Sequence, residues 1–384
     1  MDPSDKQEIE RYYANLSTQI RLFGAEHLGR SYVVVRLARI EATSPLDFSD
    51  IQRILGKVHD ARSWYPAWQA EGVKAAAAAE SHEADGRLVS AADMQWRTAA
   101  CYHWGQYLAR VGSDQKAEGR VERVRHYRRA VELSDDWIER VEIPYGDHVL
   151  PGYLHRAAGG PAPAPCVIMV NGADSVKEEY HAWARQFVRR GLSVLTMDGP
   201  GQGELVGVLP MRPEAWHEPI GAAIDVLEAD ALVDGGAIGI WGSSMGGYLA
   251  IEAAAHEPRL AAATSSGGFY DFRDFPYWPV STQLNVMEDL MAPSLGAARE
   301  HMERHCSLES VVGDVGCPYL VIHGERDELV TLEEARQLAS GRRGELVNFP
   351  DGFHTCTNYN AELVPLMCDW MAARLTAARS RVAT

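Results

Sequence analysis

The chain has 384 residues, 46% of them hydrophobic and 23% charged, which is enough for one large domain and one smaller domain with a sizeable core. Its formal net charge of -16 argues against nucleic acid or an anionic membrane as a partner. Six scattered cysteines without a C-x-x-C pair indicate neither a zinc site nor a disulfide framework. The polar N-terminus and the lack of a membrane-spanning apolar run predict a cytoplasmic protein.

The first part of the chain carries apolar residues at helical spacing. We expect an all-helical domain over residues 1–135. Its predicted helices cover residues 7–26, 47–64, 66–84, 89–111 and 115–133.

The pattern changes after Trp137. Two alternating segments, 138–144 and 148–155, predict a pair of antiparallel strands, and a Gly/Pro/Ala linker follows at 157–165. Buried strands and amphipathic helices then alternate. Strands are predicted at 166–170, 192–197, 237–241, 260–265, 319–323 and 345–349, and helices at 178–190, 213–228, 245–256, 332–340 and 362–378.

This alternation predicts a mostly parallel sheet covered by helices on both faces, with the antiparallel pair at its edge. We assign it to a second domain, residues 136–384. The segment 268–310 interrupts the alternation and is interpreted as an insertion.

A G-x-S-x-G pentapeptide, Gly242 to Gly246, places Ser244 between a predicted strand and a predicted helix. That context is typical of a nucleophile elbow, where small neighbours allow a tight turn. Without partners, Ser244 could equally be a helix-capping serine.

A serine nucleophile needs a base, and the base needs an acid. Asp327 follows the strand 319–323 and His354 follows the strand 345–349, which gives the order Ser…Asp…His of an α/β-hydrolase. Glu325 and Asp351 compete for the role of the acid, but we interpret both as solvated loop charges. His323 lies inside a strand and is interpreted as a packed histidine.

An oxyanion hole needs two N–H donors. We expect one from Met245, directly after the nucleophile. The second should come from the loop after the strand 166–170, with Ala173 preferred and Gly172 as the alternative. Next on this loop, Lys177 and two glutamates are expected to open a helix, where the acidic residues favour the helix dipole.

Several motifs together resemble one branch of the α/β-hydrolases. They are N-G-A-D-S-x-K-E-E at 171–179, D-G-P-G-Q-G-E at 198–204, W-G-S-S-M-G-G at 241–247, S-G-G-F-Y-D at 266–271, I-H-G-E-R-D at 322–327 and D-G-F-H at 351–354. The branch includes 2,6-dihydroxypseudooxynicotine hydrolase, fungal polyketide-shortening hydrolases and FrsA-like esterases.

The resemblance implies that the helical N-terminus forms a lid over the active site and that the protein is a homodimer. It also implies C–C bond cleavage in a ketone substrate, and it places Ser244, Asp327 and His354 on the family's triad positions. The chain departs from the family at the oxyanion loop and in the insertion. Asp271 and Asp274 are candidates for any extra catalytic carboxylate that a relative carries there.

We expect a small-molecule substrate, such as a β-diketone-like or polyketide-like ketone, and no metal or cofactor. His217, Trp278 and Tyr277 are candidate substrate contacts, although a surface position for His217 and core packing for the aromatic residues explain them as well. A carboxylesterase or lactonase with the same triad is the main alternative. An acyltransferase or cyclase of secondary metabolism and a non-catalytic binding protein remain open.

Overall fold

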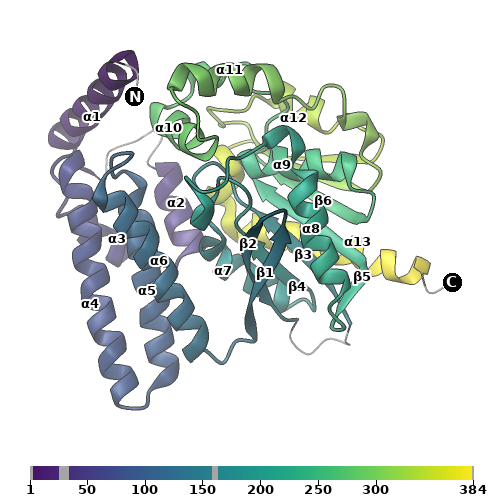
Figure 1. The fold of residues 1–384 in the computed structure, drawn as a ribbon, viewed down its shortest axis with the longest axis horizontal. Coiled ribbons are helices and arrows are strands. Elements are labelled where there is room, and N and C mark those ends of the chain that lie inside the picture. The colour runs from purple at the N-terminus through teal and green to yellow at the C-terminus, as the bar shows by residue number, and fades with distance from the viewer. Residues whose placement is uncertain (1–2, 26–33, 158–162, 383–384) are drawn as a thin grey trace. The chain divides into compact units, whose positions relative to one another are not determined.

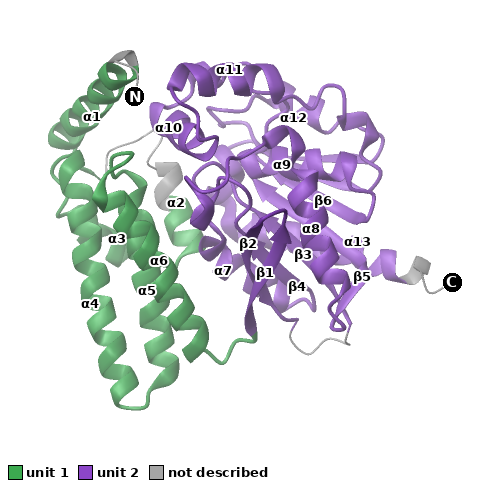
Figure 2. Ribbon diagram, in the orientation of Figure 1, with its two compact units in different colours: residues 1–137 green, residues 138–384 purple. Residues whose placement is uncertain are grey.

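The computed structural model describes residues 3–25, 34–157 and 163–382, so the predicted linker at 157–165 lies partly outside the described residues. The chain forms two compact units (Figure 2), Met1–Trp137 and Ile138–Thr384, which we call the helical unit and the sheet unit. The division after Trp137 lies two residues beyond the boundary that the sequence predicts.

The helical unit is built on three long antiparallel helices. Helix α5 packs against both α4 and α6. Trp64 and Trp104 are buried between them, and the indole N–H of Trp64 donates to the carbonyl oxygen of Trp104 at 2.8 Å. The helices are α1 (Pro3–Phe23), α2 (Val34–Thr43), α3 (Phe48–Leu55), α4 (Trp64–Ala84), α5 (Leu88–Tyr107) and α6 (Asp114–Leu133).

The predicted helices of this unit differ from the observed ones at several points, and the helix predicted over 89–111 ends at Tyr107 as α5. Helix α1 ends at Phe23 because Gly24 adopts a positive φ of 80°. The helix predicted over 47–64 is wrong as a single element, since α3 ends at Leu55 with Gly56 as its C-cap and a separate 3₁₀ turn covers Ala61–Ser63. Helix α2 was not predicted.

The sheet unit contains eight strands in the order β1-β2-β4-β3-β5-β6-β7-β8 (Figure 1). Strands β1 and β2 are antiparallel and lie at one edge, and the pairs from β3 to β8 are parallel, which confirms the predicted sheet. The strands are β1 (Ile138–Tyr145), β2 (His148–His155), β3 (Ala164–Val170), β4 (Ser193–Met197), β5 (Val233–Ser243), β6 (Leu260–Ser266), β7 (Tyr319–Gly324) and β8 (Gly344–Phe349).

Helices cover both faces of this sheet. Helices α8 and α9 contact each other and pack on one face, and α7 and α13 contact each other on the opposite face (Figure 1). The insertion contains α10 and α11. The helices are α7 (His181–Val188), α8 (His217–Glu228), α9 (Met245–His256), α10 (Val280–Asp289), α11 (Leu295–His305), α12 (Leu332–Leu338) and α13 (Asn360–Val382).

The topology determines where a site can form. Strand β4 lies on one side of β3 and the next strand in the chain, β5, lies on the other side. The direction in which successive strands are added to the sheet therefore reverses at β3. Loops that leave the carboxyl ends of adjacent strands on opposite sides diverge at such a point, which is the usual position of a binding site in sheets of this type.

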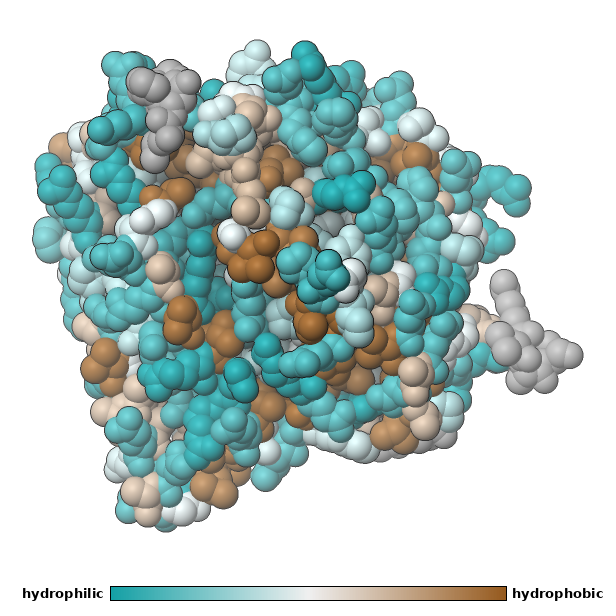
Figure 3. Space-filling model, in the orientation of Figure 1, coloured by the Kyte–Doolittle hydropathy of each residue, from teal (hydrophilic) through white to brown (hydrophobic). Residues whose placement is uncertain are grey.

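Within the described ranges, no helix has both the length and the apolar character that a membrane crossing requires. Hydrophilic residues cover most of the face drawn in Figure 3, and apolar residues lie among them. This surface agrees with the acidic composition of the chain.

We predict that His155 makes the stability of the protein depend on pH. The side chain is buried at the end of β2, and burial lowers the pKa of His155 from 6.5 to about 3. The imidazole of His155 is therefore neutral in the folded protein. Its contribution to the free energy of unfolding is complete above about pH 6.5. That contribution is lost as the pH falls toward 3, by at most about 1.4 kcal/mol per pH unit.

His155→Leu should reduce the dependence of the unfolding free energy on pH between about 6.5 and 4 by close to one proton. Urea unfolding at a series of pH values measures it. His148→Leu, at the exposed start of the same strand, is the matched control and should leave the slope unchanged. An unaltered slope in His155→Leu would contradict the assignment.

Candidate active site

Ser244 lies on a tight turn between β5 and α9 with φ 57° and ψ −127°. This conformation is costly for a residue with a side chain and persists only where the surroundings impose it. Glycines allow the close packing that does so. A Cβ on Gly242 would lie 2.0 Å from the carbonyl oxygen of Gly246, and one on Gly246 would lie 2.6 Å from that of Val170. The turn therefore has the geometry of a nucleophile elbow.

Ser244, His354 and Asp327 lie in one hydrogen-bonded chain. Ser244 Oγ is 2.8 Å from His354 Nε2, and His354 Nδ1 is 2.8 Å from Asp327 Oδ2. The side chain of Asp327 is fully buried and that of His354 is 12% exposed. The other oxygen of Asp327 accepts the backbone N–H groups of Leu329 and Val330, which fixes the carboxylate toward the imidazole.

The loops that carry Asp327 and His354 are joined directly. The backbone N–H of Arg326 donates to the carbonyl oxygen of Gly352 at 2.9 Å. After His354 the backbone takes two successive left-handed residues, Thr355 with φ 63° and Cys356 with φ 56°. These contacts define the position of the imidazole independently of the serine.

The competing acids lie elsewhere. Glu325 is exposed and accepts a hydrogen bond from Asn348 at 2.6 Å, and Asp351 is exposed and pairs with Arg326. His323 is buried in β7, where burial lowers its pKa. None of the three replaces Asp327 or His354 in the hydrogen-bonded chain.

The loop after β3 distinguishes the two candidate oxyanion donors. The N–H of Gly172 donates to Ser175 Oγ at 2.6 Å, and that hydroxyl also bonds the hydroxyl of Tyr180 at 2.8 Å. The N–H of Ala173 donates to no acceptor among the described residues. Met245 opens α9, where first-turn amides lack intrahelical acceptors. The geometry therefore favours Ala173 and Met245 as the donor pair.

A buried ionic cluster lies beneath this loop. The ammonium of Lys177, fully buried, is 2.6 Å from Asp198 Oδ2, 2.6 Å from Glu178 Oε1 and 2.7 Å from Glu204 Oε1. The side-chain amide of Asn171 donates to Asp198 Oδ1 at 3.0 Å. Burial raises the pKa of Glu204, but Lys177 and Arg140 outweigh it and the pKa is lowered overall.

This cluster corrects the expectation that Lys177 and the two glutamates open a helix, with the acidic residues there to favour its dipole. They form the 3₁₀ turn Lys177–Tyr180, all of them buried, and α7 begins only at His181. Their role is to tie the oxyanion loop to Asp198, the first residue of the D-G-P-G-Q-G-E motif. The lysine of one motif and the acidic residues of the other could have suggested an ion pair between the two loops. Which residues pair could not be read from the sequence.

The remaining candidate residues fall in different surroundings. His217 opens α8 and bonds Glu252, two helical turns beyond Ser244. Asp271 pairs with Arg273, Asp274 is exposed, and Tyr277 is 86% exposed. No described contact brings any of these four candidates to His354; their predicted contacts with substrate stay predictions.

Trp278 reaches the triad through a residue that sequence reasoning missed. Its ring packs against that of Phe269 with centroids 4.2 Å apart, and the ring of Phe269 lies 5.9 Å from that of His354. Phe269 belongs to the S-G-G-F-Y-D motif that supported the family resemblance. The ring is 1% exposed, so it packs beside the imidazole within the core.

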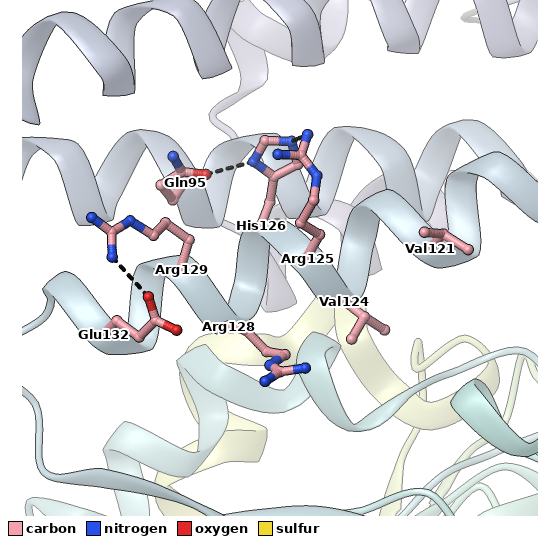
Figure 4. A pocket seen from close by; sticks show the side chains of 8 residues that line it. All are labelled: Gln95, Val121, Val124, Arg125, His126, Arg128, Arg129 and Glu132. Atoms are coloured by element: carbon pink, nitrogen blue, oxygen red, sulfur yellow. Dashed lines mark hydrogen bonds and ion pairs between the residues drawn. The ribbon is translucent and has the colours of Figure 1, made fainter.

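A separate hollow of about 460 Å³ lies on the helical unit between α5 and α6 (Figure 4). Three of its four basic groups are paired within the unit. Arg129 donates to Glu132, Arg125 pairs with Glu122, and His126 bonds Gln95, while burial lowers the pKa of His126 to about 4. None of the residues lining it is a candidate of the sequence analysis.

The strand order and the serine elbow define a hydrolase of the α/β-hydrolase fold. A family model described as "Esterase FrsA-like" matches residues 5–296, and one described as "Prolyl oligopeptidase family" matches residues 218–377. The chain belongs to the α/β-hydrolase family, in the group of the FrsA-like esterases.

Similar proteins include hydrolases from a bacterium and a fungus. The chain is 30% identical over 322 residues to 2,6-dihydropseudooxynicotine hydrolase of Paenarthrobacter nicotinovorans, covering 83% of this chain and 86% of the relative. It is 33% identical over 260 residues to the alpha/beta hydrolase psoB of Aspergillus fumigatus, covering 62% of this chain and 58% of that relative.

Solved structures agree with these relatives. The crystal structure of 2,6-dihydroxy-pseudo-oxynicotine hydrolase matches with a TM-score of 0.81 and 28% identity, covering 89% of this chain and 96% of that one. The structure of AbyA5 matches with a TM-score of 0.68 at 20% identity, which shows a shared fold.

We predict that Lys177→Met destabilises the protein by about 3–5 kcal/mol, because the buried carboxylate of Asp198 loses its cation. Urea unfolding measures the change. Arg304→Met, which removes a surface pair with Glu300, is the matched control and should cost less than about 1 kcal/mol. Equal costs for the two variants would contradict a stabilising role for the cluster.

Proposed function

We propose that the protein is a serine hydrolase that cleaves a C–C bond in an aromatic or polyketide-like ketone. The observation that carries the hydrolase proposal is the pair of 2.8 Å distances that join Ser244, His354 and Asp327. Nucleophile, base and orienting acid stand in the geometry that acyl transfer requires.

In the first step Ser244 Oγ attacks the carbonyl carbon, and its proton passes to His354 Nε2. Asp327 holds the imidazolium that forms. The negative charge on the former carbonyl oxygen is stabilised by the N–H groups of Met245 and Ala173. Removal of one such donor typically costs about 10²–10³-fold in rate.

In the second step the C–C bond breaks and its electron pair stays on the leaving carbon, which takes the proton from His354. A carbonyl group or an electron-rich ring next to that carbon is needed to delocalise the charge. Water then attacks the acyl-serine with His354 as the base, and the acid is released as Ser244 regains its proton. The proton that leaves on the carbon fragment is replaced by one from water, so the enzyme is restored and one water is consumed.

The similarity to a relative and the motif resemblance favour a ketone with an aromatic portion. The chain is similar along most of its length to a hydrolase of 2,6-dihydropseudooxynicotine, and the motif resemblance points to ketone substrates. Phe269 is 1% exposed and packs on Trp278 with its ring 5.9 Å from that of His354, so the base lies against buried aromatic side chains.

Ester hydrolysis is the second candidate, favoured by the match of residues 5–296 to the FrsA-like esterases. It uses the same residues, and only the leaving group differs, an alkoxide instead of a carbanion. The lid role of the helical unit and a homodimer are further proposals that rest on the family resemblance.

The test compares aryl 1,3-diketones with p-nitrophenyl acyl esters and identifies the products by mass spectrometry. We expect the diketones to split into an acid and a ketone faster than the esters turn over. Ser244→Ala should lose about 10⁴–10⁶-fold of the rate. Ser243→Ala, the adjacent serine at the end of β5, is the matched control and should retain activity.

Ester turnover with intact diketones would overturn C–C cleavage while keeping the serine hydrolase. Diketone cleavage that survives in Ser244→Ala would overturn the assignment of the nucleophile.

A further inference from the structure

A cluster of two histidines and a glutamate lies in the sheet unit outside the triad. Glu252 and His256 stand four residues apart on α9, so their side chains share one face of the helix. His217 is the first residue of α8, which packs beside α9 (Figure 1). Glu252 lies about 12 Å along the helix from Ser244, eight residues at about 1.5 Å each.

Glu252 is held in one orientation. Its side chain is 3% exposed, and Oε2 accepts the backbone N–H of His217 at 2.8 Å. Oε1 is therefore directed to both imidazoles, 2.8 Å from His217 Nδ1 and 3.2 Å from His256 Nδ1. The two rings stack with centroids 4.7 Å apart. Burial raises the pKa of Glu252, because a charged carboxylate is unfavourable where water is excluded. A cation bound beside the carboxylate compensates for that cost.

We propose that His217, Glu252 and His256 bind a divalent transition metal ion, with Zn²⁺ the best fit. One ligand atom from each residue lies within 4.8 Å of the other two. Donors around a tetrahedral zinc with bonds of about 2.0–2.2 Å stand about 3.3 Å apart, close to the distances between the imidazoles and Oε1. Two imidazoles and a carboxylate are a set that zinc accepts.

The surroundings also fit a metal ion. The side chains of His217 and His256 are 33% and 39% exposed, which gives the ion an entry path and leaves room for water as a fourth ligand. The N–H of His217 on Oε2 acts as an outer partner that orients a ligating carboxylate. His217 Nδ1 now bonds Oε1, whereas His256 Nδ1 also lies 3.0 Å from the backbone carbonyl oxygen of Glu252. The ion replaces these hydrogen bonds and links the start of α8 to the helix that follows Ser244.

Two other groups of potential ligands in the described residues are poorer candidates. Glu178, Asp198 and Glu204 already surround the ammonium of Lys177. In the group of Glu214, His301 and Cys306, the thiol is 1% exposed and burial raises its pKa, so it stays protonated. This last group provides a matched control because its histidine is also 33% exposed.

The experiment uses the full chain, freed of metal with a chelator and of any affinity tag. Isothermal titration with Zn²⁺ should give one ion per chain. His217→Gln and His256→Gln should each weaken binding at least about tenfold, and the double variant should abolish it. His301→Gln should bind as the unaltered protein does. Co²⁺ should give a tetrahedral visible spectrum without a thiolate charge-transfer band.

Thermal melting without metal shows whether each variant is folded, and His256→Gln, on the outer side of α9, is the variant least disturbing to the fold. The proposal is overturned if the folded protein binds no Zn²⁺ or if the double variant binds it unchanged. Loss of binding in His301→Gln alone would place the ion at the group of Glu214, His301 and Cys306 and would equally overturn it.

Discussion

The left-handed turn at Ser244 is the constraint on which the rest of the site depends. A side chain at φ 57° is stable only if its neighbours leave the backbone no alternative. Gly242 and Gly246 allow the first turn of α9 to come into contact with the ends of β5 and β3. The buried packing of α9 on the sheet then holds the hydroxyl within 2.8 Å of His354. Packing in the core therefore determines the position of the hydroxyl oxygen of Ser244.

The opposite side of the site is held by charge. Lys177 is fully buried, and it is tolerated there only because three carboxylates surround it. Asp198 accepts hydrogen bonds from the ammonium and the backbone N–H of Lys177 and from the side-chain amide of Asn171. The loop with Gly172 and Ala173 is therefore tied at both ends. Apolar packing positions the serine, and a polar cluster positions the loop opposite it.

Local patterns made much of this structure predictable. Strand β2 and helix α9 have the predicted bounds, because alternation and the elbow motif are local signals. The triad residues follow from strand-end loops in a fixed order. The break after Leu55, the burial of Lys177 and the contact of Phe269 with His354 depend on partners distant in sequence, and no local pattern encodes them. The choice between Gly172 and Ala173 likewise depends on a single hydroxyl, that of Ser175.

The two left-handed residues after His354 have a consequence for repeated turnover. Glycine would adopt those angles without cost, but it would also give the loop many other conformations of similar energy. Thr355 and Cys356 hold these costly angles only because the surrounding structure imposes them, and Gly267 closes against Thr355, where a Cβ would come within 2.8 Å of its backbone nitrogen. The packed loop therefore holds the imidazole in one place, so a turnover that uses it as the base would begin each time from the same position.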